Sequence, residues 1–170
     1  MDIDRQLIEA NPQLVQFSSS IIDVLDANRL CSMATVGPTG AAHANIAYFA
    51  ADRHLNLFVL TRRTTRHSRH VESNPTVAVT VFDSRQIWNQ PHLGLQLFGR
   101  CTRVPEGSSA AAFSVYSAKH PDLLGLAKSS DDMLSRLESR FYLIDVRAIH
   151  IVDEARFGDD TGFTIEIVKS

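Results

Sequence analysis

Apolar residues recur in short stretches, alternating with polar ones or running together, and turn residues separate the stretches. This pattern predicts mostly strands. The expected strands span residues 30–36, 41–50, 55–60, 76–82, 93–104, 141–152 and 163–168. Residues 141–152 form either one long strand or a pair of strands. Helical spacing predicts helices over residues 18–28, 107–119 and 131–137. Six or seven short strands, joined mostly by tight turns such as Gly37-Pro38-Thr39-Gly40, indicate a mainly β fold: an antiparallel barrel with peripheral helices.

Length and composition bound the class of protein. A chain of 170 residues with 44% hydrophobic and 21% charged residues predicts one globular domain over residues 1–170. Neither a membrane-spanning run nor a secretory signal is expected from the sequence. Cys31 and Cys101 lie in apolar segments, so we expect reduced, buried thiols in a cytoplasmic protein. The net charge of −2 argues against a general nucleic-acid binder.

A local basic segment follows the third expected strand. The first ten residues from Thr61 hold four arginines, two histidines and three threonines. Thr61 ends the strand, Thr65 is the expected N-cap, and Arg66 and His67 fall in the first helical turn. A phosphate at this point would accept charge-assisted hydrogen bonds, each contributing roughly 1.5–3 kcal/mol. The alternative is a solvated helix face whose surface ion pairs contribute little.

The same stretch resembles a known cofactor motif. Leu57-Phe58-Val59-Leu60-Thr61, then Thr65-Arg66-His67, Val71 and Asn74-Pro75 are similar to the flavin-phosphate motif of the pyridoxamine 5′-phosphate oxidase-like split-barrel family. The resemblance covers most of residues 18 to 152 and implies an FMN-binding split barrel. It implies that Thr61, Thr65, Arg66 and His67 hold the FMN phosphate, with His67 where a lysine is usual.

The resemblance also implies a homodimer with FMN between the subunits. The strand segment Ala44-Asn45-Ile46-Ala47 would then run beside the flavin ring, with Asn45 hydrogen-bonded to ring heteroatoms. The alternative is that these small residues simply fit a tight barrel. Trp88 and Gln96 would reach the partner's flavin, or Trp88 would anchor the dimer interface. The arginine and histidine pair with which oxidase members grip pyridoxal phosphate is not found, so vitamin B6 oxidation is not expected.

Two function classes follow. The first is an FMN-dependent oxidoreductase that acts on a small molecule, with NAD(P)H as a possible partner and no assigned catalytic residue. The second is a non-enzymatic module of the same fold that binds flavin, haem or F420. Haem would need an axial ligand, for which His43, His54, His92 and His120 are candidates. No metal site is expected, because His67 and His70 lack a nearby carboxylate or cysteine partner.

Overall fold

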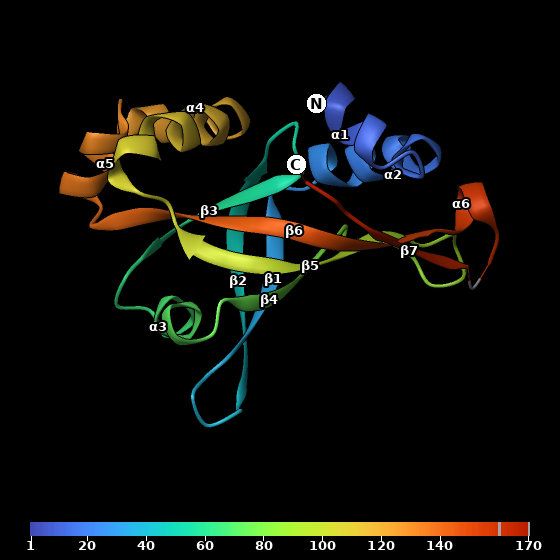
Figure 1. Ribbon diagram of the computed structural model, residues 1–170, viewed down its shortest axis with the longest axis horizontal. Coiled ribbons are helices and arrows are strands. Elements are labelled where there is room, and N and C mark those ends of the chain that lie inside the picture. The colour runs from blue at the N-terminus through green and yellow to red at the C-terminus, as the bar shows by residue number, and fades with distance from the viewer. Residues whose placement is uncertain (160, 170) are drawn as a thin grey trace.

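The computed structural model describes residues 1–159 and 161–169 of the chain. Within them, seven strands form one antiparallel sheet in the order β3-β2-β1-β4-β5-β6-β7. β3 also pairs with β6, so the first six strands close into a barrel and β7 continues the sheet beyond β6 (Figure 1). The strands are β1 (Leu30–Val36), β2 (Ala42–Ala51), β3 (Asn56–Arg62), β4 (Thr76–Phe82), β5 (Leu93–Arg103), β6 (Ser139–Asp153) and β7 (Gly162–Glu166). The predicted mainly β antiparallel barrel is therefore confirmed.

Helices cover the barrel from several sides (Figure 1). They are α1 (Arg5–Ala10), α2 (Leu14–Ala27), α3 (Arg66–Ser73), α4 (Ser109–Lys119), α5 (Ser130–Arg136) and α6 (Glu154–Phe157), with short 3₁₀ turns at Glu106–Ser108 and Pro121–Gly125. The sequence did not predict α1 or α6, because helices of 6 and 4 residues are too short to show a helical period. No helix among the described residues is long and apolar enough to cross a membrane.

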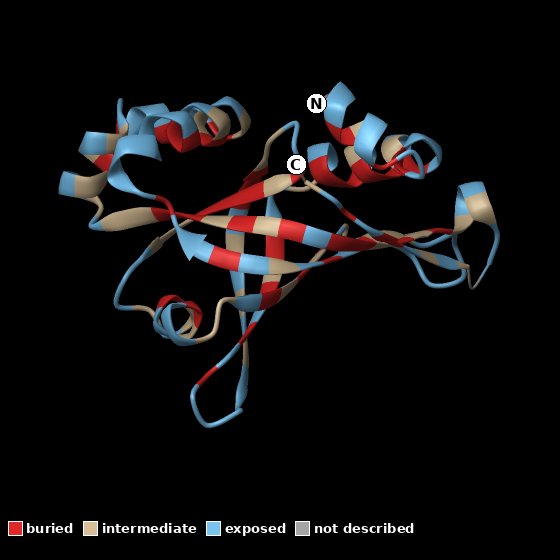
Figure 2. Cartoon of the chain, in the orientation of Figure 1, coloured by how far each residue is buried: buried red, intermediate tan, exposed pale blue. Residues whose placement is uncertain are grey.

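Buried and more exposed residues alternate along the strands (Figure 2). The buried apolar residues form two clusters. In β3, Leu57 and Val59 face the barrel interior, where Phe17 and Ile21 of α2 also pack. Phe58 of β3 instead joins the cluster beneath α4 and α5. The predicted buried, free cysteines, Cys31 and Cys101, are confirmed. Burial raises the pKa of both thiols to about 12 and keeps them protonated.

A β-bulge bends the barrel where β5 meets β6. The register shifts between Phe98 and Gly99, and Arg147 is left outside the pairing. A Cβ atom on Gly99 would overlap the carbonyl oxygen of Asp145, so only glycine fits this close approach. The bulge therefore depends on the partner strand β6 as well as on β5.

α3 covers one end of the barrel. It connects β3 to β4, contacts β1, β2 and β5, and buries Val71. The loop 83–92 follows the other end of β4, so β4 separates it from α3. The turn between β1 and β2 extends beyond the barrel on the side of α3 (Figure 1).

Candidate phosphate site at the start of α3

The start of α3 is fixed by its cap. Thr65 has extended backbone angles, and its side chain accepts a hydrogen bond from the amide of Ser68 at 3.3 Å. Ser68 is fully buried, and its hydroxyl donates to the carbonyl of Arg62 at 2.9 Å. The predicted N-cap at Thr65 is therefore confirmed. Because the first amides of a helix lack acceptors within the helix, this end favours an anion.

Three of the four predicted phosphate ligands converge at this cap. The Oγ1 atom of Thr61 lies 2.8 Å from Nε2 of His67, and Oγ1 of Thr65 lies 3.0 Å from the same nitrogen. The two hydroxyl oxygens are 3.4 Å apart. We call Thr61, Thr65 and His67 the Thr–His cluster. Thr65 Oγ1 also lies 3.0 Å from the carbonyl oxygen of Arg62 and 2.7 Å from the hydroxyl of Ser68. Each threonine hydroxyl can turn its proton toward an incoming oxygen.

The fourth predicted ligand, Arg66, does not join this cluster. Its side chain is exposed and has no hydrogen bond or ion pair with any residue that the structure describes. It follows Thr65 directly, at the first helical position of α3. The guanidinium group is therefore free to move to an anion at the cap.

Burial and two neighbouring histidines favour the neutral form of His67. Burial lowers the pKa of His67 below its usual range, and the nearby charges of His43 and His70 lower it further. The ring of His43 is stacked 6.4 Å from that of His67, and it meets the ring of His70 edge-on at 5.7 Å. His67 is thus neutral near pH 7 without an anion. No three His, Cys, Asp or Glu side chains among the described residues are arranged to hold a metal ion.

The β2 residues that were predicted to contact the flavin lie on two different faces of the strand. Asn45 and Ala47 are half-buried on the inner face, whereas Ala44 and Ile46 are exposed on the outer face. The Oδ1 atom of Asn45 is buried and accepts no hydrogen bond from the described residues. An unpartnered buried carbonyl is costly, so this atom is a strong acceptor for a ligand N–H.

Gln96 and Trp88 lie away from the Thr–His cluster. Gln96 is exposed on the outer face of β5, beside an open cleft of about 430 Å³ that Phe82 and His92 also line. Trp88 is 89% exposed in the loop after β4, at the opposite end of β4 from α3. A single chain does not bring either residue to the cluster.

The four candidate haem ligands differ in availability. His120 is buried, with Nε2 2.8 Å from the carbonyl of Phe49 and Nδ1 3.2 Å from a guanidinium nitrogen of Arg29. Both ring nitrogens of His120 are therefore occupied. His92 lies 3.5 Å from Glu154, and His43 stacks among the histidines near α3. His54 is exposed in the turn before β3.

Sequence reasoning missed two residues near the cluster. Ser68 supports the cap of α3. Its position three residues after the N-cap Thr65 is a spacing from which its role could have been predicted. Arg140, the second residue of β6, lies directly opposite Thr61, and only the pairing of β3 with β6 places it there. Nothing in the sequence alone reveals that pairing.

Comparison with known proteins identifies the family whose sequence pattern this chain matches. A family model described as pyridoxamine 5′-phosphate oxidase matches residues 17–152. No curated protein matches the chain. Among solved structures, a protein of unknown function from Agrobacterium tumefaciens is similar at 20% identity and a TM-score of 0.66, over 85% of this chain and 62% of that one.

The names of two other similar solved structures include a cofactor. A heme binding protein from Mycobacterium smegmatis is similar at 12% identity and a TM-score of 0.68, over 88% of this chain and 57% of that one. An F420 reductase is similar at 18% identity and a TM-score of 0.55, over 75% of this chain and 94% of that one. The chain spans less than two thirds of the length of the Agrobacterium tumefaciens and Mycobacterium smegmatis proteins. At sequence identities of 20% or less, these likenesses show the fold alone.

Proposed function

This chain belongs to the pyridoxamine 5′-phosphate oxidase family, and on that premise we propose that it is an FMN-binding oxidoreductase that acts on a small molecule. The observation that carries the proposal is the convergence of Thr61, Thr65 and His67 at the capped start of α3. Two hydroxyls, one imidazole and the first helical amides make a donor set suited to a phosphate. Arg66 supplies the neighbouring positive charge.

Strand β2 supports a flavin ring beside that phosphate. The unpartnered Oδ1 of Asn45 is an acceptor for a ring N–H. The small side chain of the exposed Ala44 leaves the outer face of the strand open to close approach, whereas Ala47 packs against the core. Bound flavin would supply the hydride chemistry, while these residues bind and orient it.

The outer face of the barrel supports a homodimer. Apolar side chains project there from β1, β2, β4 and β5, and they include Leu30, Ile46, Tyr48, Phe82 and Phe98. Ile46 is 74% exposed and Tyr48 is 56% exposed. A contiguous apolar face on a sheet marks an interaction surface. A second copy on this face would bring Gln96 and Trp88 of one subunit toward the flavin of the other.

The absorbance spectrum of the purified protein tests the proposal. We expect the visible flavin bands, and we expect NAD(P)H or another reductant to bleach them. A Soret band would identify haem instead and would contradict the proposal. The alternative function, a non-enzymatic carrier of flavin, haem or F420, predicts a bound chromophore that no physiological reductant bleaches.

Arg66→Ala tests the predicted phosphate contact. Loss of one charge-assisted hydrogen bond should weaken FMN binding by about 1–3 kcal/mol, or tenfold or more. Fluorescence titration of the apoprotein with FMN measures this. Arg69→Ala is the matched control, because it removes the same charge from the next turn of α3 and should leave the affinity unchanged. If both variants lose FMN affinity equally, Arg66 contributes only general positive charge and not a direct phosphate contact.

A further inference from the structure

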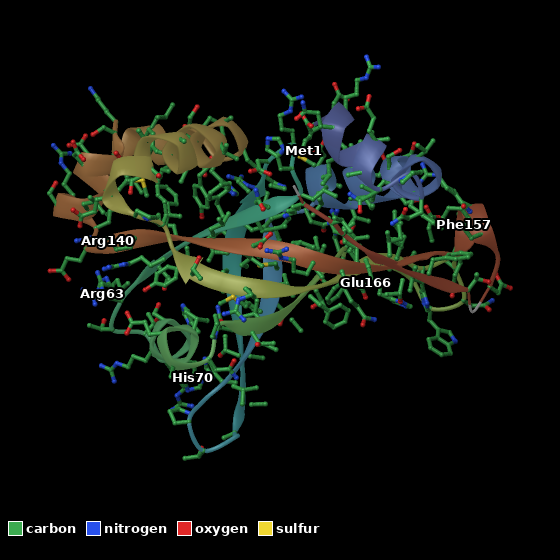
Figure 3. All side chains as sticks on the ribbon, viewed as in Figure 1. Met1, Arg63, His70, Arg140, Phe157 and Glu166 are labelled. Atoms are coloured by element: carbon green, nitrogen blue, oxygen red, sulfur yellow. The ribbon has the colours of Figure 1, made fainter. Side chains whose placement is uncertain are left out.

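A second cationic cavity adjoins the Thr–His cluster. Its volume is about 190 Å³, and it lies where β3 ends and β6 begins. We call it the arginine pocket, and it is lined by Arg62, Arg63, Thr64, Leu134, Glu138 and Arg140. Figure 3 shows Arg63 and Arg140 on the same flank of the molecule. Neither Arg62, Arg63 nor Arg140 belongs to the phosphate site described above.

Arg140 has a donor without an acceptor. Its Nε atom is buried and has no hydrogen-bond partner among the described residues. Among the described residues, the guanidinium group of Arg140 donates one hydrogen bond, from Nη1 to the carbonyl oxygen of Ser139 at 3.2 Å. Leaving a buried donor unsatisfied costs about 1–3 kcal/mol, and more for a charged group. An oxyanion in the pocket would remove this cost.

The charges that line the pocket are not balanced. Arg63 lies 3.7 Å from Glu72, which is a long, exposed ion pair. Arg62 and Arg140 make no ion pair with any described residue, and neither does Glu138, the only acid on the pocket wall. Three arginines and one glutamate therefore line the pocket. This excess favours a bound anion over an empty pocket.

The strand register connects the pocket to the cluster. Arg140 pairs directly with Thr61 across β3 and β6, so their side chains leave the same face of the sheet. Arg62, Arg63 and Thr64 occupy the chain between Thr61 and Thr65. The two sites thus share one turn and one strand pair, and they lie side by side.

We propose that the arginine pocket is a second anion subsite, which takes a compact phosphate or carboxylate group next to the phosphate held by the Thr–His cluster. The planar guanidinium fork of Arg140 suits bidentate contact with such a group, and the hydroxyl of Thr64 adds a donor. The second group belongs either to an extension of the cofactor or to a separate substrate. The description of the first phosphate as that of FMN rests on the proposed function.

NMR of the arginine side chains tests this subsite. The Nε–Hε signal of Arg140, assigned by its loss in Arg140→Lys, reports directly on the unpartnered donor. Inorganic phosphate is added to the ligand-free protein and to the FMN-saturated protein, and FAD is added to a third sample. We expect the signal to shift with saturation when phosphate is added to the FMN-saturated protein, or when FAD replaces FMN.

The outcomes separate the sources of the second group. A shift with phosphate in FMN-saturated protein assigns the subsite to a separate molecule, and a shift with FAD but not FMN assigns it to the cofactor. A shift caused by FMN alone, with no response to phosphate or FAD, would place Arg140 in the first site and overturn the proposal. No shift with any probe would also overturn it. If FMN does not bind at all, the ligand-free titration still reports on the pocket.

Charge variants complete the test. Arg140→Gln and Arg140→Lys should each weaken phosphate binding at this subsite at least tenfold, because both remove the fork. Arg136→Gln is the control, since Arg136 is exposed on α5 and does not line the pocket. Circular dichroism checks that each variant folds. Unchanged phosphate affinity in both folded Arg140 variants would overturn the proposal.

Discussion

His67 occupies the position at which the family resemblance leads one to expect a lysine, and the structure gives this difference a chemical consequence. Burial and the neighbouring charges of His43 and His70 lower its pKa, so the imidazole is neutral near pH 7. A phosphate dianion bound at the proposed site would stabilise the protonated ring and raise that pKa. The proposed phosphate binding would therefore be linked to the uptake of a proton.

This linkage predicts that FMN affinity rises as pH falls from about 8 toward the ordinary histidine pKa of about 6.5. His67→Lys keeps its charge throughout this range and should flatten the dependence. Because the FMN phosphate itself titrates near pH 6, the comparison between the two proteins isolates the histidine. Fluorescence titration across this pH range measures the effect, and parallel pH profiles would contradict it.

At the residue scale, prediction from sequence succeeded where the signal was local. Thr65 was identified as the cap because it directly precedes a basic helical stretch after a strand, and the structure confirms it. The stacking of His43 on His67 and the place of Arg140 opposite Thr61 depend on strand pairing. A single sequence contains no local signal for either.

Among the elements, the junction between α5 and β6 carries backbone strain. Glu138 follows the end of α5 with φ of 51°, in the left-handed region where glycine is usual. Glu138→Gly should therefore raise the free energy of unfolding by about 0.5–1 kcal/mol, after the greater freedom of glycine in the unfolded chain is counted. Urea denaturation measures the change.

Glu138→Ala is the matched variant for this prediction. It removes the same carboxylate but keeps a Cβ atom, so the strain remains and no comparable gain is expected. If glycine and alanine give equal stability, the gain comes from the lost charge beside the arginines, and the account of strain is wrong.

Most elements were predictable because apolar and polar residues repeat along them with a short, regular spacing, and turn residues mark their ends. The hairpin over residues 30–36 and 41–50 was expected from the alternation and from Gly37–Gly40, and it is confirmed as β1 and β2. For residues 141–152 the sequence left open one strand or two. The structure shows one 15-residue strand that pairs with β3, β5 and β7, and its bulge opposite Gly99 allows it to bend.

For the whole molecule, barrel closure and the exposed apolar face were beyond local prediction. Closure requires β3 to find β6 across about 80 residues of chain, which no turn signal specifies. The fold class still followed from the number and spacing of strands. The outer face, by contrast, becomes visible only when β1, β2, β4 and β5 are aligned in register.

The proposed dimer predicts the effect of a charge on that face. Ile46→Asp should shift the protein from dimer to monomer, because a carboxylate would be buried without a partner at the interface. Ile46 is already 74% exposed in the single chain, so the fold should survive. Val15→Asp on α2, at 64% exposure, is the control and should leave the dimer intact. Sedimentation velocity distinguishes these results, and an Ile46→Asp variant that stays dimeric would exclude this face.

The central claim is that the start of α3 holds a cofactor phosphate. Calorimetric titration of the ligand-free protein with FMN and with riboflavin tests it most directly, because the two flavins differ only in that phosphate. We predict that FMN binds at least tenfold more tightly, a difference of about 1.4 kcal/mol or more. Equal affinities for the two flavins would contradict the claim.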